Sequence, residues 1–250
     1  MLQKSSIQKK DAVSIPNSIN NIRKKIVLNK KMLKIGHRGA SGHSAENTIA
    51  SFQKAIDLGC NGIELDVHRC KTNEIVVIHD NSINRTTNAT GLVQQLTLND
   101  LRQHKIPTLI EVLDLVNNKL LVNIEIKNRD CTTQVAEIIN HYVHNKNWKY
   151  SNLLVSSFDW PCLMQIAHYN NQILTAILTA KSFNEAFDFA KTIKAHAINA
   201  QYKLLNQENV TLAHQNNFKI FAWTVNDLSD IEKMKVLKID GIISDFVDRL

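Results

Sequence analysis

The chain has 250 residues, 44% of them hydrophobic, and contains only seven Gly and three Pro. This length suits one large α/β domain or two small ones, and the scarcity of Gly and Pro excludes turn-rich repeats and long structureless linkers. The formal net charge is +7, but residues 1–31 hold eight basic side chains and one acid, whereas residues 32–250 carry 22 of each sign. A neutral remainder argues against a nucleic-acid-binding domain.

Residues 1–31 form a polar, basic segment ahead of the first apolar run of strand length. Such a segment is typical of a solvated, disordered N-terminal extension, so the folded domain is predicted to span residues 32–250. Contact of this basic extension with an anionic membrane is the less favoured alternative. No apolar run in the sequence is long enough for a signal-peptide core or a transmembrane helix.

The cysteines show neither a CxxC pair nor zinc-ligand spacing. This pattern indicates reduced thiols, which are typical of a cytoplasmic protein. The four cysteines are Cys60, Cys70, Cys131 and Cys162.

In chain order, apolar runs of strand length alternate with stretches of helical periodicity, which predicts a parallel sheet covered by helices. Strands are predicted at 33–36, 63–67, 75–79, 120–126, 153–156, 173–178, 197–199, 219–223 and 241–244. Helices are predicted at about 47–59, 108–117, 132–145, 160–169, 183–193, 206–216 and 227–236.

One of these strands does not fit a wholly parallel arrangement. The linker between Val67 and Ile75 is too short for a crossover helix, so strand 75–79 is predicted to form a hairpin with strand 63–67. The other eight strands and the chain length fit a (β/α)₈ TIM barrel, with a doubly wound open sheet as the alternative. Residues 81–118 are the least regular and are predicted to add a short insertion over the barrel mouth.

Two acids stand two residues apart in the second predicted strand. Because side chains alternate along a strand, Glu64 and Asp66 point to one face, which in a barrel is the interior. Glu125 recurs near the end of a later strand as a candidate third carboxylate. Buried carboxylates need a compensating cation, and hard oxygen ligands suit Mg²⁺ or Ca²⁺. The alternative is an exposed strand face with the apolar neighbours buried, and the alternation fits both interpretations.

His37 and His79 each end a predicted strand, and Arg38 directly follows His37. Cleavage of a phosphodiester needs one proton removed and one delivered, and histidine can do either near neutral pH. Arg38 and Lys127 can neutralise phosphate oxygens. The other eight histidines are interpreted as structural or solvated, and only His68 lies close to the acids in the sequence.

Three further residues stand near the ends of predicted elements. Asn47 precedes the first predicted helix and is interpreted as its N-cap, and Glu46 lies beside it in the loop after the first strand. Trp223 ends another strand, where it could line the pocket. Core packing is the more common role for such a tryptophan.

The order of short motifs along the chain resembles the glycerophosphodiester phosphodiesterase family. This resemblance implies a TIM barrel and metal-dependent hydrolysis of a glycerol-linked phosphodiester. The motifs are HRG at 37–39, ENT at 46–48, ELDV at 64–67, HD at 79–80, RTT at 85–87, IPTL at 106–109, NIEIK at 123–127, SSF at 156–158, WTVN at 223–226 and GIISD at 241–245.

The resemblance also implies a role for individual residues. It makes His37 and His79 the acid–base pair, and it makes Arg38 and Lys127 the phosphate-binding residues. Trp223 is implied to line the substrate pocket. The implied ligands of the divalent cation, Mg²⁺ or Ca²⁺, are Glu64, Asp66 and Glu125.

The sequence departs from the family pattern at a few positions. Ala45 replaces the usual Pro before ENT, Ser244 replaces a Thr, and the stretch between Leu101 and Ile106 is short. The usual turn before the HD strand is also replaced, but Asn73 can take the left-handed conformation that such a turn needs. No proposed catalytic position is altered, so an active enzyme is predicted.

The predicted function is hydrolysis of a small glycerophosphodiester, such as glycerophosphocholine, to glycerol 3-phosphate and an alcohol. A lysophospholipase D-like cleavage of a lysophospholipid is the alternative enzyme activity. A non-catalytic binder of a phosphate ligand on the same scaffold is the alternative from another class. The sequence leaves open the alcohol group, the identity of the metal, the oligomeric state and the roles of the two histidines as acid or base.

Overall fold

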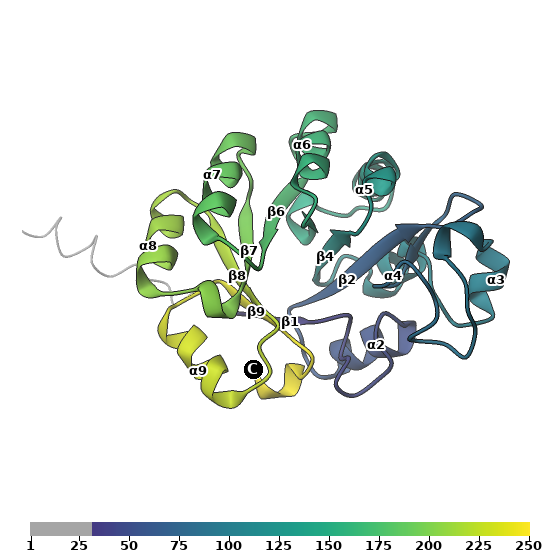
Figure 1. Ribbon diagram of the computed structural model, residues 1–250, viewed down its shortest axis with the longest axis horizontal. Coiled ribbons are helices and arrows are strands. Elements are labelled where there is room, and N and C mark those ends of the chain that lie inside the picture. The colour runs from purple at the N-terminus through teal and green to yellow at the C-terminus, as the bar shows by residue number, and fades with distance from the viewer. Residues whose placement is uncertain (1–31) are drawn as a thin grey trace, which may run out of the picture. The chain divides into compact units, whose positions relative to one another are not determined.

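Strands and helices alternate along residues 32–250, the part of the chain that the computed structural model describes (Figure 1). The predicted disordered extension over residues 1–31 lies outside the described residues. The strands are β1 (Leu33–Gly36), β2 (Gly62–Arg69), β3 (Ile75–Val77), β4 (Leu121–Ile126), β5 (Leu153–Ser157), β6 (Leu174–Thr179), β7 (Ala197–Gln201), β8 (Lys219–Trp223) and β9 (Gly241–Ser244). The α-helices are α2 (Ile49–Asp57), α3 (Leu98–Arg102), α4 (Leu109–Val116), α5 (Thr132–Asn145), α6 (Trp160–Tyr169), α7 (Phe183–Ile193), α8 (Gln207–Gln215) and α9 (Leu228–Val236).

All strands except β3 are parallel, and they close into a barrel in the order β1-β2-β4-β5-β6-β7-β8-β9. Closure is made by β1, in which Ile35 pairs with Gly62 of β2 on one side and with Ile243 of β9 on the other. The predicted (β/α)₈ TIM barrel is therefore confirmed. The doubly wound alternative is wrong, because an open sheet has two edge strands, whereas β1 here pairs with β2 and with β9 and closes the ring.

β3 is antiparallel to β2, with Val67 opposite Val77 and Arg69 opposite Ile75. The hairpin turn contains Asn73 at φ 76°, the left-handed conformation predicted from the sequence. The predicted hairpin is therefore confirmed, although its second strand ends at Val77 and not at residue 79. His79 consequently lies in the loop that follows the hairpin.

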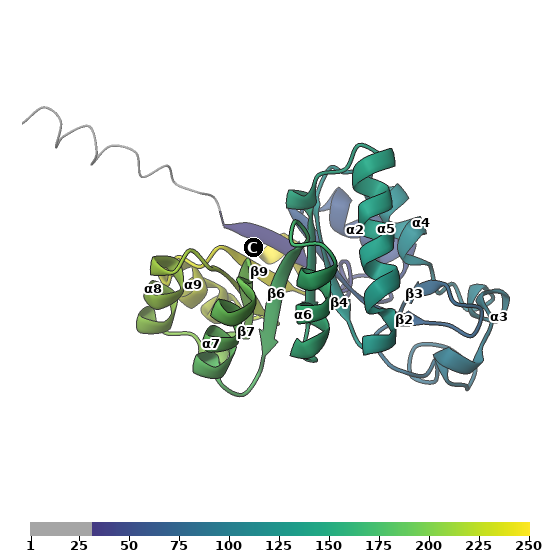
Figure 2. The same cartoon turned by 90° about the horizontal axis from the view of Figure 1, so that it is seen from above.

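The predicted insertion follows β3 and contains a short helix, α3, that the sequence did not predict. Thr97 and Asp100 form a reciprocal capping box at its start, which stabilises only five helical residues. Figures 1 and 2 place α3 on the side of the barrel away from α7, α8 and α9. The insertion packs around its own small apolar cluster, made of Cys70, Val76, Ile78, Ile83, Val93, Leu101 and Ile106.

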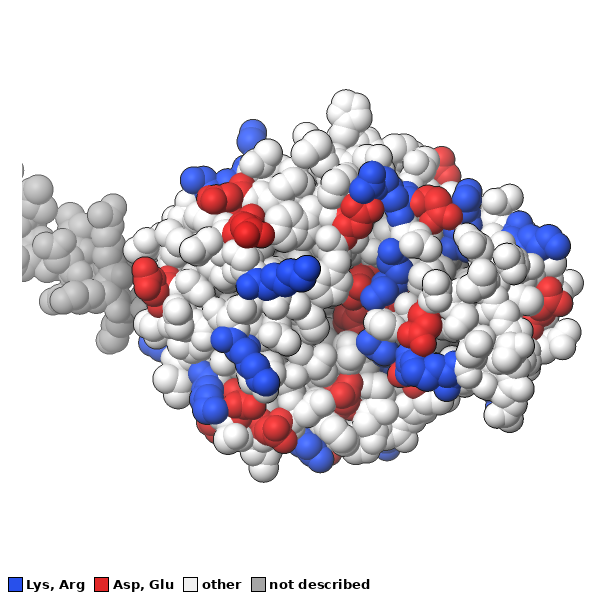
Figure 3. Space-filling view, viewed as in Figure 1, with Lys and Arg blue, Asp and Glu red and all other residues white. Residues whose placement is uncertain are grey.

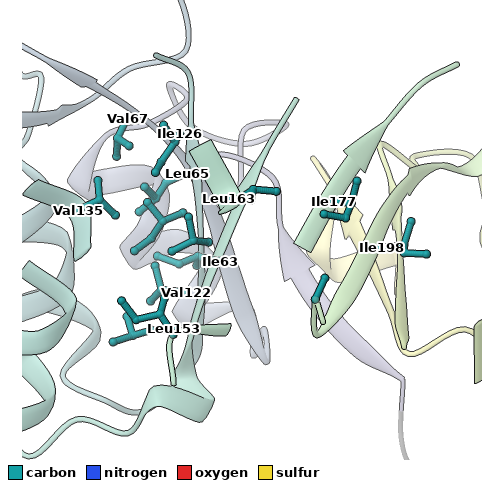
Figure 4. Packing of buried hydrophobic residues seen from close by; sticks show 14 of the residues in the cluster. Ile63, Leu65, Val67, Val122, Ile126, Val135, Leu153, Leu163, Ile177 and Ile198 are labelled. Atoms are coloured by element: carbon teal, nitrogen blue, oxygen red, sulfur yellow. The ribbon is translucent and has the colours of Figure 1, made fainter. Parts of the chain in front are cut away.

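The main hydrophobic core lies between the barrel and the surrounding helices (Figure 4). In β2, Ile63, Leu65 and Val67 face this layer, where Val135 of α5 and Leu163 of α6 are also buried. The alternate residues of β2 therefore face the barrel interior. A second apolar cluster fills the barrel interior beneath the carboxyl ends of the strands, so the polar side chains of the interior gather at those ends. Its residues are Ile35, Leu154, Ala176, Ala197, Phe221 and Ile243.

All four cysteines are free and buried, in agreement with the predicted reduced thiols. Within residues 32–250, no helix has both the length and the apolar character needed to cross a lipid bilayer.

Candidate active site

The carboxyl ends of the barrel strands surround a cavity of about 100 Å³. In the view of Figure 3, acidic side chains lie in a hollow near the middle of the molecule, among lysines and arginines. The cavity brings together all but one of the predicted site residues, and Asp66 is buried beneath it. The residues that line it are His37, Arg38, Glu64, His79, Asn123, Glu125, Lys127, Phe158, Leu178, Trp223, Thr224 and Ile243.

The three predicted metal ligands form one buried cluster. Glu64 and Asp66 are 3% and 1% exposed, so the alternative of an exposed strand face is wrong. Asp66 lies opposite Glu125 of β4, and a carboxylate oxygen from each of the three acids lies within 4.8 Å of the others. Burial, and then the charge of Asp66, raise the pKa of both Glu64 and Glu125. The cluster is therefore unfavourable for three negative charges unless cations compensate them.

Two protein cations partly compensate the acids. Lys127 Nζ lies 2.6 Å from Glu125 Oε1 and 3.4 Å from Asp66 Oδ1, while Arg38 Nε lies 3.3 Å from Asp66 Oδ2. Three acids thus face two permanent cations, so ionisation of all three needs a further positive charge. A set of hard carboxylate oxygens of this kind fits a divalent cation such as Mg²⁺ or Ca²⁺.

The loop after β1 has an unusual backbone that positions Arg38. Arg38 adopts a left-handed φ of 53°, and its backbone N–H donates to Glu64 Oε2 at 3.0 Å. Ser51 of α2 donates to the Arg38 carbonyl at 3.0 Å. Gly39 follows at φ 87°, where a side chain would collide with Ser51. Both the conformation and the close approach therefore require glycine at this position.

Asn47 is not the N-cap of α2, which corrects the sequence interpretation. The cap is Thr48, whose hydroxyl accepts from the backbone N–H of Ser51. Asn47 takes a left-handed φ of 55°, is buried, and donates through Nδ2 to Asp66 Oδ2 at 2.9 Å. The amide therefore orients one of the candidate metal ligands.

His37 is held from behind by Asp245, which follows β9. The His37 Nδ1 to Asp245 Oδ1 distance is 2.6 Å, while Nε2 faces the acids and lies 4.0 Å from Glu64 Oε2. Burial alone lowers the pKa of His37, but the hydrogen bond to Asp245 and the charge of Glu64 outweigh it and raise the pKa above its usual value. Ser41 and Asn226 donate to Asp245 at 2.7 Å each.

His79 has a similar partner in the residue that follows it. Its Nδ1 lies 2.6 Å from Asp80 Oδ1, and Asp80 in turn accepts two hydrogen bonds from Arg85, at 2.8 and 3.0 Å. His68, on β2, is 4% exposed and bonds through Nε2 to the His79 carbonyl at 3.1 Å. Burial lowers the pKa of His68, so this histidine is neutral and supports the loop of His79.

Glu46 connects the two halves of the site. It accepts from Arg38 at 2.9 Å and from Arg85 at 2.8 and 2.9 Å. The hydrogen bonds from Arg85, together with the nearby Arg38, lower the pKa of Glu46 to about 2 against the opposing effect of burial. Glu46 is thus ionised at neutral pH and joins the loop after β1 to the insertion.

Trp223 lines the cavity and also packs against the apolar cluster of the barrel interior. Its Nε1 donates to the carbonyl of Asn199 at 2.9 Å, which fixes the indole. Phe158 stands edge-on to it, with ring centroids 5.5 Å apart, and remains 48% exposed. Together they form an apolar side opposite the charged side of the cavity.

The sequence interpretation missed four residues that the structure places around the site: Asp80, Arg85, Phe158 and Asp245. Each belongs to one of the quoted motifs, so a signal was present in HD, RTT, SSF and GIISD. Motif order alone does not reveal which side chains meet. Only for Asp80, the immediate neighbour of His79, could proximity have been read directly.

Comparisons with known proteins match nearly all the described residues to one family. Residues 37–249 match the sequence model of the glycerophosphoryl diester phosphodiesterase family. A glycerophosphodiester phosphodiesterase of Caldanaerobacter subterraneus subsp. tengcongensis is 34% identical over 230 residues, which cover 86% of this chain and 94% of that protein.

Solved structures show the same barrel. The glycerophosphodiester phosphodiesterase of Thermotoga maritima matches with a TM-score of 0.77 at 30% identity, covering 87% of this chain and 96% of that one. A phosphodiesterase of Oleispira antarctica, in complex with the product sn-glycerol-3-phosphate, matches with a TM-score of 0.77 at 23% identity, covering 86% and 93%.

Proposed function

Because the chain belongs to the glycerophosphoryl diester phosphodiesterase family, we propose that this phosphodiesterase hydrolyses a glycerophosphodiester to sn-glycerol 3-phosphate and an alcohol. The observation that carries the proposal is that one small cavity is lined by His37, His79, Arg38 and Lys127 above the three acids. It thus combines proton transfer, phosphate binding and a candidate metal site, which this reaction needs together.

Glu64, Asp66 and Glu125 would hold the divalent cation. When bound, Mg²⁺ or Ca²⁺ would supply Lewis-acid stabilisation of charge on the phosphate oxygens. The proximity of the three carboxylates and their burial support this assignment.

The two histidines act at opposite sides of the scissile bond. One accepts the proton of the attacking glycerol hydroxyl, whose oxygen bonds to phosphorus to give a cyclic phosphate, and the other donates a proton to the leaving alcohol oxygen. Water then opens the cyclic phosphate to sn-glycerol 3-phosphate, with the two proton transfers reversed. The guanidinium of Arg38 and the ammonium of Lys127 neutralise the non-bridging phosphate oxygens. Trp223 packs against an apolar part of the substrate.

The size of the cavity supports a small polar substrate. Its volume of about 100 Å³ is well below the roughly 300–1,000 Å³ of pockets that enclose drug-sized ligands. A glycerol phosphate unit suits such a space, and the product bound to the Oleispira antarctica phosphodiesterase supports this substrate class.

The test is release of choline from glycerophosphocholine by the purified protein, with Mg²⁺, with Ca²⁺ and with excess EDTA. We expect release with one or both metals, formation of sn-glycerol 3-phosphate, and loss of activity in EDTA that returns on adding metal. Absence of release with either metal, for this and other glycerophosphodiesters, would refute the proposal.

Lysophospholipase D-like cleavage is a second candidate, favoured by Phe158, which leaves an apolar side chain half exposed beside Trp223 at the cavity mouth. An acyl chain could lie along this side of the mouth. Faster release of choline from a lysophosphatidylcholine than from glycerophosphocholine would support this candidate, and Phe158→Ala should then slow only the lipid reaction.

A further inference from the structure

Both candidate catalytic histidines are held in the same way by a carboxylate at Nδ1. The His37–Asp245 and His79–Asp80 distances are both 2.6 Å. Such a bond fixes the ring and its tautomer, so that Nδ1–H is donated and Nε2 is left for the substrate. The two pairs differ in what holds the carboxylate in place.

Asp245 is fixed by neutral donors. Ser41 Oγ donates to the oxygen that also binds His37, and Asn226 Nδ2 donates to the other oxygen. Asn226 Oδ1 in turn accepts from the backbone N–H of Asp245 at 3.0 Å. Burial opposes ionisation of this carboxyl, but the hydrogen bonds from His37 and Ser41 hold its pKa below the usual range. Asp245 is therefore a rigid, ionised acceptor behind His37.

Asp80 is fixed by a guanidinium from the insertion. Arg85 forms a two-pronged contact with Asp80 and a second one with Glu46, which binds Arg38. The hydrogen bonds from Arg85, and then that from His79, hold the pKa of Asp80 well below its usual range. An unbroken set of charge-assisted hydrogen bonds therefore runs from His79 through the insertion to Arg38.

The supporting residues lie outside the reaction space. The catalytic cavity is lined by His37 and His79, whereas Arg85 lines a neighbouring cavity of about 340 Å³. Asp245 and Arg85 consequently reach the substrate only through another side chain.

We propose that Asp245 and Arg85 are positioning residues of this enzyme: Asp245 sets His37 directly, and Arg85 sets His79 through Asp80, so that both Nε2 atoms face the substrate. The role of the two histidines in this statement rests on the proposed function. The contacts of Asp245 and Arg85 do not depend on it.

The chain supplies a matched control for each residue. Asp248 pairs with His43 at the same 2.6 Å, only three residues from Asp245, but His43 lies outside the catalytic cavity. Arg102 lies in the same insertion as Arg85 and pairs with Glu111 at 3.3 Å. Asp248→Ala and Arg102→Gln therefore remove comparable ion pairs without touching the catalytic histidines.

A double-mutant cycle tests Asp245. We expect Asp245→Ala to lower kcat by about tenfold or more, with a smaller change in KM, because a misoriented base or acid affects chemistry more than binding. In the His37→Ala background the same change should lower kcat by less than about twofold, since the histidine that Asp245 positions is absent. In the His79→Ala background it should keep its full effect. Equal losses in all three backgrounds would mean a general structural defect and would overturn the proposal.

The corresponding cycle tests Arg85. Arg85→Gln should lower kcat by a clearly larger factor in the wild type than in the His79→Ala background, where only its second contact, through Glu46 to Arg38, is left to lose. Arg85→Lys should restore little, because an ammonium cannot make two two-pronged contacts. Full recovery with Lys, or a loss that Arg102→Gln reproduces, would contradict the assignment.

Nuclear magnetic resonance of the ¹⁵N-labelled histidine rings gives a readout that needs no substrate. We expect Asp245→Ala to change the Nδ1–H signal of His37 alone and Arg85→Gln to change that of His79 alone, while Asp248→Ala leaves both unchanged. If the wild type hydrolyses no glycerophosphodiester, the proposed function fails, yet these spectra still decide the positioning roles. Unchanged ring signals in both variants would overturn them.

Discussion

At the scale of single residues, Glu64 shows that a group suited to bind a cation can lower the stability of the fold. The side chain is buried, its pKa is raised by that burial and then by Asp66, and the backbone of Arg38 beside it takes a left-handed conformation that non-glycine residues disfavour. Neighbouring contacts such as those of Asn47 and Ser51 hold these groups in place. Local features of this kind are typical of functional sites.

Glu64→Gln should separate the two effects. At pH 9 without divalent metal, above the raised pKa of Glu64 of about 8, the variant should melt higher than the wild type, because one repelling charge is removed. About 1 kcal/mol corresponds to roughly 2–4 °C for a domain of this size. Adding Mg²⁺ or Ca²⁺ should raise the melting temperature of the wild type but hardly that of the variant. Differential scanning fluorimetry with and without EDTA measures both. The control is Glu137→Gln on the exposed side of α5, and a variant that responds to metal like the wild type would contradict the assignment.

The two histidines give a direct test of catalysis. His37→Ala and His79→Ala should each lower turnover by roughly 10²–10⁴-fold, because each removes one proton-transfer group. Circular dichroism should show an unchanged fold, since neither side chain belongs to the main hydrophobic core. His168→Ala, on the exposed side of α6, serves as the control. Normal turnover in either active-site variant would refute the proton-transfer role of that histidine.

At the scale of elements, the insertion is joined to the barrel by Glu46 and Arg85. Backbone hydrogen bonds also tie the insertion to the hairpin, from Lys71 to Leu96 and from Val77 to Pro107, and the ion pair adds a contact with the loop after β1. The charge of Glu46 is therefore part of the stability of the connection.

The pH dependence of stability follows from the lowered pKa of Glu46. A group with a pKa of 4.5 when unfolded and about 2 when folded stabilises the protein fully above about pH 4.5. This stabilisation is lost progressively as the pH falls from 4.5 to 2. The melting temperature of the wild type should thus fall more steeply over this range than that of Glu46→Gln. Parallel profiles for the two proteins would show that Glu46 does not contribute.

Elements with clear periodicity could be predicted from the sequence, and those set by a few contacts could not. The predicted bounds of α5 and β8 match the structure, because the periodicity of a long or strongly apolar segment is visible in its own residues. The short helix α3 depends on a capping box within a polar stretch, so periodicity gives no sign of it. Asn47 has the residue type of an N-cap, but its contact with Asp66, across 19 residues, decides its conformation.

For the site, the sequence reveals the reacting groups more readily than their supports. Acids two residues apart on one strand share a face by geometry alone, so the common orientation of Glu64 and Asp66 was predictable, but the alternation did not tell whether that face is buried. The pairing of His37 with Asp245 joins residues 208 apart, and only closure of the barrel brings them together. No local pattern contains that information.

For the whole molecule, the described site lies entirely within residues 32–250, where acidic and basic residues are balanced. We therefore expect a protein that starts at Met32 to keep the kcat/KM and melting temperature of the full chain. Steady-state kinetics on glycerophosphocholine and calorimetry would check this. A large loss of either would assign residues 1–31 a part in the fold or the site.

The closure of the barrel by β1 and β9 has a consequence for biosynthesis. The ribosome makes the partner of His37, Asp245, 208 residues after His37 itself, and the sealing strand β9 directly precedes Asp245. A nascent chain that stalls before Ser244 would hold nearly every reacting group and still lack an ordered site. We expect nascent chains to stay inactive until β9 and Asp245 have left the ribosome, so that cleavage of the diester reports closure of the barrel. Activity in a stalled chain that ends before β9 would contradict this.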